Sequence, residues 1–337
     1  MSPEGKSAPV RMPRAVRIRE VGPRDGFQNE PEIIPTELKV ELIDALARTG
    51  LRRIEVTSFV RATTIPQLAD AEEVLARITV PEYVALSVLV ANERGLDRAL
   101  AVRERGRPQA PITQVTVFMS ASETHNRKNL NRSVEESLAG LETVLGRARA
   151  EGLRCEAVLS TSFGCPYEGA VPPQRVLGLA AALRGAGAQE IALADTTGMA
   201  NPMQVVALFE DARGRLGAEG WRPAEAEGEA GGELELTAHF HNTRGQGLAN
   251  VLAALQAGVA SFESSFGELG GCPVPAGATG NIASEDLVSM LSEMGIETGV
   301  ELEALIACAR RAQEILGRPL GSHTLVAGPV GTLAGGE

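Results

Sequence analysis

The stretch AVRIREVGPRDGFQNE, residues 15–30, separates two α/β folds that the rest of the chain leaves open. Its first half, AVRIREVG (15–22), is one of several short β-branched runs that we expect to form strands. A doubly wound dinucleotide-binding sheet would carry a GxGxxG loop directly after this strand. The chain continues instead with EVGPRDGFQNE (20–30), which lacks that fingerprint. The doubly wound sheet is therefore only the second candidate.

The same strand pattern recurs seven times further along the chain. These runs lie at 52–58, 83–90, 114–120, 154–162, 190–196, 234–242 and 261–267. Amphipathic helical patterns separate them, and several of these end in glycine, as helix C-termini tend to. Eight βα units in series predict an α/β protein with a TIM (β/α)8 barrel. An additional C-terminal helix is expected at 301–317.

The pattern divides the chain into a leader, one catalytic domain and a tail. Residues 1–15 lack the apolar core of a signal peptide and are expected to be a disordered leader. Residues 16–317 comprise the barrel with its C-terminal helix, and the Gly-rich residues 318–337 are expected to be a flexible tail. The acidic segment 217–233 precedes the seventh strand, where we expect a mobile and catalytically silent loop.

Composition excludes several classes of protein. With 337 residues, 44% of them hydrophobic, the chain is long enough for a sizeable core. Its net charge of −11 argues against a nucleic-acid partner, but not against an anionic substrate, which needs only local positive charge. No apolar run approaches the ~20 residues of a membrane span. The four cysteines have no CxxC spacing, so we expect free thiols in a reducing cytoplasm.

Two of the four histidines, His239 and His241, lie two positions apart in the run ELELTAHFHN (233–242). Residues two apart on a strand face the same side, so the two imidazoles project together. Paired imidazoles suit a divalent metal, although two hydrogen-bonded core histidines are the commoner case for an isolated HxH. Asp25 follows the first strand and can converge with them in a closed barrel. Such a mixed N/O set with open positions suits Mg²⁺ or Mn²⁺.

Other reactive side chains also follow strands, where the active sites of TIM barrels lie. The planar fork of Arg24 suits a substrate carbonyl or carboxylate, and an ion pair of Arg24 with Glu55 or Asp195 is compatible with that role. The glycine-rich loop 267–280 is expected to be a mobile lid. Its cysteine, Cys272, is either a candidate acid, base or nucleophile or an incidental loop thiol.

Five motifs carry a family resemblance. They are VGPRDGFQNE, IEVTSF, GCPYEG, HFHNTRGQGLAN and GGCPVPAGATGNIASEDLVSML, and in this order they resemble the hydroxymethylglutaryl-CoA lyase family. That family belongs to the metal-dependent TIM barrels related to isopropylmalate synthase, and the resemblance spans residues 16 to about 317. It implies a carbon–carbon lyase that cleaves 3-hydroxy-3-methylglutaryl-CoA into acetyl-CoA and acetoacetate by a retro-Claisen reaction.

The resemblance also implies a role for each site residue. The implied ligands of the Mg²⁺ or Mn²⁺ ion are Asp25, His239, His241 and Asn281. Asp25 and His239 are counted among the catalytic residues as well. Arg24 matches the arginine that steadies the thioester oxygen as it becomes an enolate, Glu55 and Asp195 match its acidic support, and Cys272 matches the loop cysteine over the substrate. An acyl-CoA substrate, a homodimer, a cytoplasmic location and a role in leucine catabolism follow as expectations.

Departures from the family pattern leave the acyl group open. Arg244 stands where the family usually has tyrosine, and RATT (61–64) replaces a segment with an aromatic residue. A different 3-hydroxyacyl-CoA, such as citramalyl-CoA, is therefore an alternative substrate. A Claisen-condensing acyltransferase of the isopropylmalate synthase type is a second alternative, against which the Cys272 loop argues. A non-enzymatic barrel is a third, against which the intact ligand set argues.

Overall fold

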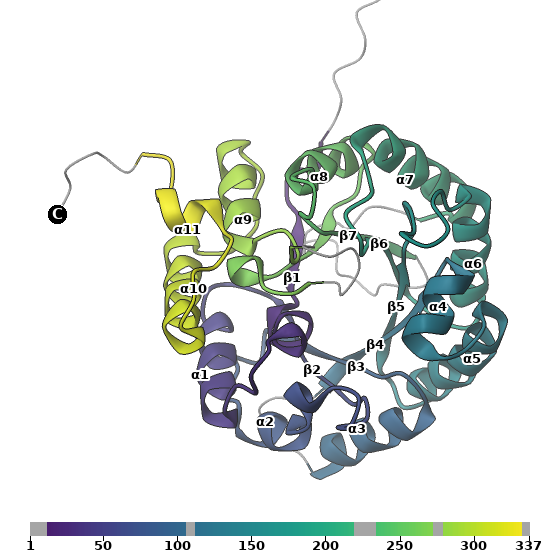
Figure 1. Cartoon of the computed structure of the whole chain (residues 1–337), viewed down its shortest axis with the longest axis horizontal. Helices are drawn as coiled ribbons and strands as arrows, with labels where there is room; N and C mark the ends of the chain where they lie inside the picture. Colours follow the sequence, from purple (N-terminus) through teal and green to yellow (C-terminus); the bar gives the residue numbers. More distant parts are fainter. Residues whose placement is uncertain (1–11, 106–111, 219–233, 272–278, 332–337) are drawn as a thin grey trace, which may run out of the picture.

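Eight parallel strands close into a barrel in which each strand pairs with its neighbours in sequence and β8 pairs with β1 (Figure 1). The computed structural model describes residues 12–105, 112–218, 234–271 and 279–331. The strands are β1 Arg17–Glu20, β2 Arg53–Ser58, β3 Ala85–Leu89, β4 Ile112–Ser120, β5 Arg154–Ser160, β6 Glu190–Asp195, β7 Glu235–Phe240 and β8 Ser261–Ser264. The closed barrel confirms the predicted fold and excludes the doubly wound sheet.

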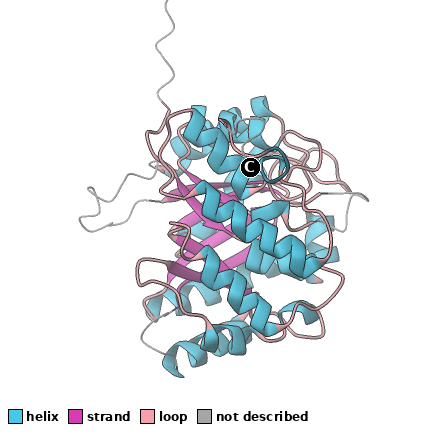
Figure 2. Cartoon of the chain, turned by 90° about the vertical axis from the view of Figure 1, so that its left-hand side faces the viewer, coloured by secondary structure: helices cyan, strands magenta, loops and turns pink. Residues whose placement is uncertain are grey.

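The helices surround the barrel, and the view from the side shows the strands enclosed by them (Figure 2). They are α1 Thr36–Leu46, α2 Ala71–Arg77, α3 Glu93–Arg105, α4 Glu123–Leu130, α5 Val134–Ala150, α6 Pro173–Gly185, α7 Pro202–Leu216, α8 Gly247–Gln256, α9 Ser284–Glu293, α10 Leu302–Leu316 and α11 His323–Ala327. The predicted additional helix is α10. No described helix is long and apolar enough to cross a membrane.

The two faces of β7 show how the strands sort their side chains. Leu236, Ala238 and Phe240 belong to the apolar core. Between them, the Thr237 hydroxyl donates to Glu190 of β6 and is within hydrogen-bond distance of the Ser261 hydroxyl of β8, and His239 contacts a side chain from β8. Alternation with period two produces this pattern, since successive side chains point to opposite faces of a strand. The inner face of β7 is therefore polar, while its outer face packs into the apolar core; on β4 to β6 the interior also holds an apolar cluster of Phe118, Val158, Ala192 and Ala194.

The segment expected to be a flexible tail differs from that expectation. Residues 323–327 form α11, whose first turn is held by Asp286 of α9. The Asp286 carboxylate accepts hydrogen bonds from the backbone N–H groups of His323 and Thr324, at 3.0 and 2.7 Å, and from the Ser322 hydroxyl. A carboxylate at a helix N-terminus satisfies N–H groups that have no partner within the helix. Most of the predicted leader, the bulk of the acidic segment and residues 272–278 of the lid lie outside the described residues.

Candidate active site

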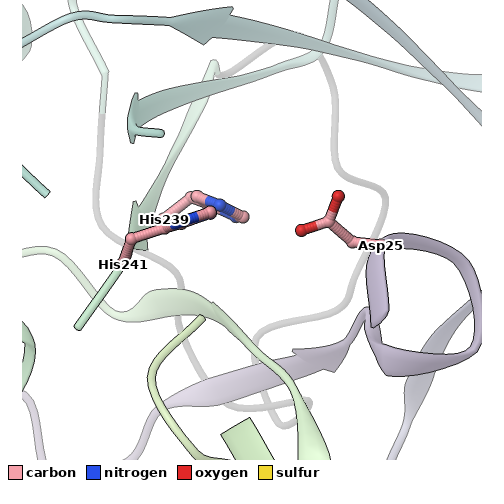
Figure 3. A group of neighbouring side chains, drawn as sticks. All are labelled: Asp25, His239 and His241. Atoms are coloured by element: carbon pink, nitrogen blue, oxygen red, sulfur yellow. The ribbon is translucent and has the colours of Figure 1, made fainter. Parts of the chain in front are cut away.

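The C-terminal ends of β1 and β7 bring three possible metal ligands together. Asp25 comes from the helical turn Gly22–Gly26 after β1, His239 from the end of β7, and His241 from just beyond it. Figure 3 shows the two imidazole rings side by side, facing the Asp25 carboxylate. One potential ligand atom from each residue lies within 4.8 Å of the others, and all three side chains are buried. The two histidines therefore share a face, as their spacing predicted.

Asn281 completes this group from the segment after the lid loop. A backbone bridge pairs it with His241, and its amide nitrogen donates to Asp25 Oδ2 at 2.8 Å and to the Leu269 carbonyl at 3.1 Å. Within the described chain, neither Asn281 Oδ1 nor His241 Nδ1 has a hydrogen-bond partner, although both atoms are buried. Buried polar atoms without partners are costly and call for an explanation. A carboxylate, two imidazoles and an amide oxygen together fit a divalent cation.

The charge states at the site also favour a cation. Burial, followed by the neighbouring His239, lowers the pKa of His241 to about 3, which keeps that ring neutral. Burial alone would raise the pKa of Asp25, but Arg24 and the two histidines outweigh it, so the carboxyl group is ionised. For His239 burial acts to lower the pKa and the Glu263 carboxylate overcomes it, so its pKa is raised. Protons and a metal therefore compete for the His239 ring.

Arg24 is fixed between two carboxylates. Its Nε donates to Glu55, and its Nη1 donates to Asp25 Oδ1 at 2.8 Å. Gln28 donates to the same Asp25 oxygen at 2.7 Å. A guanidinium has five N–H donors, so both contacts leave donors for a substrate oxygen. The anticipated ion pair of Arg24 with Glu55 is present, and it orients the Arg24 guanidinium, which borders the cavity.

A cavity of about 390 Å³ opens above this group. The metal side of its wall consists of Arg24, Asp25, Gln28, His239 and His241. The other side consists mainly of residues from β3 to β6, from α4 and from the loops after the strands, including His125, Lys128, Ser160, Tyr167 and Thr196. His125 is 7% exposed, and its Nδ1 has no partner among the described groups. Sequence reasoning missed His125, although its position just after β4 is a signal that could have found it.

Two other residues singled out from the sequence, Asp195 and Arg244, do not border the cavity. Asp195 lies at the end of β6; its Oδ1 accepts from the Met199 backbone N–H at 2.7 Å, and burial raises its pKa to about 6. Arg244 is exposed and donates to the carbonyls of Thr197 and Gly198, at 2.9 and 2.7 Å. Cys272 lies outside the described residues. The other three cysteines are free and buried; they are Cys155, Cys165 and Cys308.

The fold and the site together define a class: TIM barrels with a carboxylate–histidine group suited to a divalent cation at the C-terminal ends of the strands. Residues 15–311 match the family model described as HMGL-like, and the chain belongs to this family. A hydroxymethylglutaryl-CoA lyase from Bacillus subtilis is 46% identical over 93% of this chain and 97% of its own length. The (R)-citramalyl-CoA lyase of Chloroflexus aurantiacus is 39% identical over 94% of this chain and 96% of its own.

Solved structures agree with the family assignment. A crystal structure of the HMG-CoA lyase from Bacillus subtilis superposes with a TM-score of 0.84 at 46% identity, covering 94% of this chain and 98% of that one. An HMG-CoA lyase from Acinetobacter baumannii, in complex with coenzyme A and 3-methylmalate, has a TM-score of 0.84 at 36% identity and covers 97% of this chain and 99% of its own. The similarity therefore spans the whole barrel and does not stop at the site motifs.

Proposed function

We propose that this protein is a divalent-metal-dependent carbon–carbon lyase that cleaves 3-hydroxy-3-methylglutaryl-CoA into acetyl-CoA and acetoacetate. The observation that carries the proposal is the buried group of Asp25, His239 and His241 beside Arg24, at the edge of a cavity in an HMGL-like barrel. In this reaction the C3 hydroxyl loses its proton and becomes a ketone, while the C2–C3 bond breaks. Its electron pair forms a thioester enolate, and C2 then gains a proton.

The residues of the site suit the two stages at which negative charge develops, first on the C3 oxygen and then on the thioester oxygen. The divalent metal, when bound, lowers the pKa of the tertiary hydroxyl and orients it. Asp25, His239, His241 and the Asn281 amide oxygen would hold that metal. Arg24 would donate to the thioester oxygen as negative charge develops there, and its contacts with Glu55 and Asp25 fix its direction beforehand. Cys272 stays one of two predicted donors of the proton to C2, the other being a water held by the metal.

A second substrate has support from a specific observation. The family includes the (R)-citramalyl-CoA lyase cited above at 39% identity, close to the range of the HMG-CoA lyases. Citramalyl-CoA also carries a tertiary hydroxyl at C3, and its cleavage would release acetyl-CoA and pyruvate. Because Arg244 donates to backbone carbonyls and does not border the described cavity, we propose that it takes no part in choosing between the two acyl groups. The side chains that border the cavity would do so.

The experiment incubates the purified protein with Mg²⁺ or Mn²⁺ and each thioester, and separates the products by chromatography with mass detection. The proposal expects acetyl-CoA with acetoacetate from hydroxymethylglutaryl-CoA, and a smaller kcat/KM for citramalyl-CoA. A chelated sample is the control. Acetyl-CoA consumed with a 2-oxoacid, and no thioester cleaved, would assign a condensing enzyme instead. The identity of the metal, the homodimer, the cytoplasmic location and the role in leucine catabolism stay predictions of the family resemblance.

A further inference from the structure

The two histidines of the site are held very differently. Nδ1 of His239 lies 2.9 Å from Oε2 of Glu263, a residue of β8 that is 2% exposed. Nδ1 of His241 has no partner in the described part of the chain. His239 is therefore anchored at one ring nitrogen, with the other nitrogen left for a ligand, whereas only the backbone and packing orient His241.

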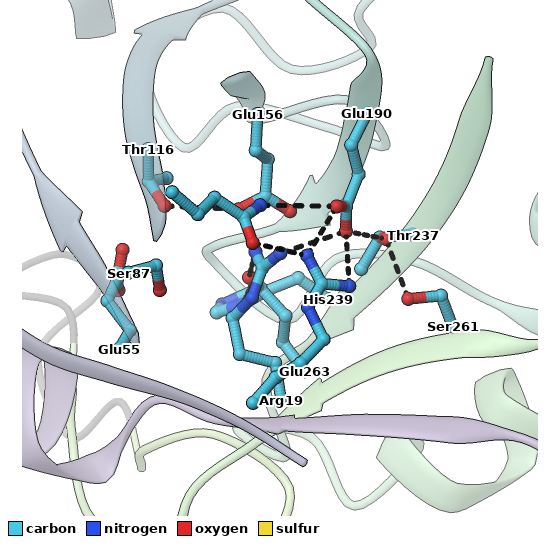
Figure 4. Close-up of polar contacts among 12 residues, drawn as sticks. Arg19, Glu55, Ser87, Thr116, Glu156, Glu190, Thr237, His239, Ser261 and Glu263 are labelled. Atoms are coloured by element: carbon cyan, nitrogen blue, oxygen red, sulfur yellow. Dashed lines mark hydrogen bonds and ion pairs between the residues drawn. The ribbon is translucent and has the colours of Figure 1, made fainter. Parts of the chain in front are cut away.

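Glu263 is itself held from behind. Its second oxygen, Oε1, accepts from Nη1 of Arg19 at 2.8 Å. Arg19 is 1% exposed and also contacts Glu190, at 3.0 Å, and Glu156. Figure 4 shows Arg19, Glu263 and His239 grouped near the carboxylates of Glu156 and Glu190. An arginine fixed by several buried carboxylates has little rotational freedom, so it also restricts Glu263.

We infer that Glu263, locked by Arg19, is the positioning residue of the metal centre. Its carboxylate accepts the Nδ1 proton of the neutral His239 ring, so the lone pair of the ring lies on Nε2 and the ring plane is fixed. Carboxylates that accept from a ligating histidine commonly set its tautomer and orientation in metal sites. The inference rests on the proposed function, because it concerns the ligand set of that same site.

A purely structural ion pair makes a different prediction. In that case Glu263 would only neutralise Arg19, and its loss would lower stability without affecting metal affinity. Glu156 provides a matched control, since it is equally buried, also contacts Arg19 and accepts from Thr116, but has no described contact with either histidine. Comparing the two glutamates separates positioning of His239 from neutralisation of Arg19.

The first experiment measures Mn²⁺ binding to metal-free protein by electron paramagnetic resonance for the parent, Glu263→Gln and Glu156→Gln. A glutamine has one carbonyl oxygen, so it cannot accept from both Arg19 and His239. We expect about a 10–100-fold weaker Mn²⁺ affinity for Glu263→Gln, the range typical of lost outer-shell partners, and near-parent affinity for Glu156→Gln. Equal affinity in the parent and Glu263→Gln, or equal weakening in both variants, would overturn the inference.

The second experiment needs no metal and no substrate. Only four histidines are present, so long-range ¹H–¹⁵N spectra of ¹⁵N-histidine protein can resolve His239 at alkaline pH, where the ring is neutral. The parent should show the Nδ1–H tautomer, and Glu263→Asp or Glu263→Gln should lose part of that preference. An Nε2–H tautomer in the parent would refute the inference that Glu263 accepts the Nδ1 proton of His239. A parent that binds Mn²⁺ yet cleaves no thioester refutes the proposed function alone.

Discussion

Two layers of buried polar side chains lie inside the barrel, and they differ in how their charges and lone pairs are paired. The lower layer consists of Arg19, Arg53, Glu156, Glu190 and Thr237. Its central carboxylate, Glu190, accepts from Arg19, Arg53 and Thr237, so opposite charges and hydroxyls meet within the layer. The upper layer consists of Asp25, His239, His241 and Asn281.

The upper layer is equally buried, and the atoms that it leaves without partners are possible metal ligands. Nδ1 of His241 and Oδ1 of Asn281 receive nothing from the described residues. Burial alone therefore does not separate a structural polar group from a binding site. The lower layer also has partnerless atoms, Arg19 Nε and Glu156 Oε1, but they belong to side chains that are ion-paired with each other. The difference lies in the kind of atom left over: in the upper layer these atoms belong to neutral groups with lone pairs, which a cation can bind.

Removing an upper-layer ligand should have the largest effect. His241→Ala deletes a candidate metal ligand that no described side chain supports. We expect a loss of Mn²⁺ affinity and lyase activity larger than the about 10–100-fold change typical of outer-shell residues, with the fold retained. Circular dichroism checks the fold. Full activity in the presence of a chelator would show that the upper layer is not a metal site.

A substitution of Arg24 should lower kcat without a matching loss of metal affinity. Arg24→Gln removes the cation facing the developing enolate, so kcat should fall by roughly 10²–10³-fold, the cost of losing one stabiliser of a developing oxyanion. Mn²⁺ affinity should change far less, because Arg24 is not a ligand. Steady-state kinetics with a parallel binding titration measure both. A proportional loss of metal would mean that Arg24 acts only by holding Asp25.

A substitution in the lower layer should lower the free energy of unfolding and leave metal affinity unchanged. Arg53 donates to Glu190 and Gln114 inside the barrel. Arg53→Met leaves a buried carboxylate short of a cation, which typically costs about 3–5 kcal/mol of the free energy of unfolding. Denaturant unfolding measures this loss. Mn²⁺ affinity of the folded fraction should stay near the parent value. A marked drop in affinity would show that the lower layer also supports metal binding.

Two buried glutamates outside both layers predict how stability depends on pH. Burial raises the pKa of Glu20 from 4.5 to about 7 and that of Glu285 from 4.5 to about 8. The folded state thus binds protons more tightly than the unfolded state, so stability falls as pH rises from about 4.5 towards 8. Glu285→Gln, which stays neutral, should flatten this fall in Tm between pH 5 and 8. An unchanged slope would show that Glu285 is ionised in the folded protein.

Arg244 should have the smallest effect. Its guanidinium is exposed and ties the loop after β7 to the turn after β6. Arg244→Ala should cost about 0.5–1.5 kcal/mol of stability, the net value of a typical hydrogen bond. The ratio of kcat/KM between hydroxymethylglutaryl-CoA and citramalyl-CoA should stay constant. A shifted ratio would place Arg244 in acyl recognition, as its departure from the family pattern first suggested.

The sequence by itself determined the barrel and the candidate metal ligands. Eight β-branched runs separated by amphipathic helices admit few topologies, and the spacing of His239 and His241 places both rings on one face. Asp25 could be added because parallel strands present their C-terminal ends at one mouth of the barrel. These inferences depend on local periodicity, which a single chain displays directly.

Only the tertiary structure decided which distant side chains meet. Glu263 reaches His239 across neighbouring strands, and 24 residues separate them in sequence with no spacing rule to connect them. Asp195 ends a strand, as a site residue would, and its carboxylate accepts from the backbone N–H of Met199, a contact that no spacing in the sequence predicts. The Gly-rich tail looked loose because its partner, Asp286, lies far away in sequence. Side-chain direction and long-range hydrogen bonds depend on packing, and periodicity does not encode them.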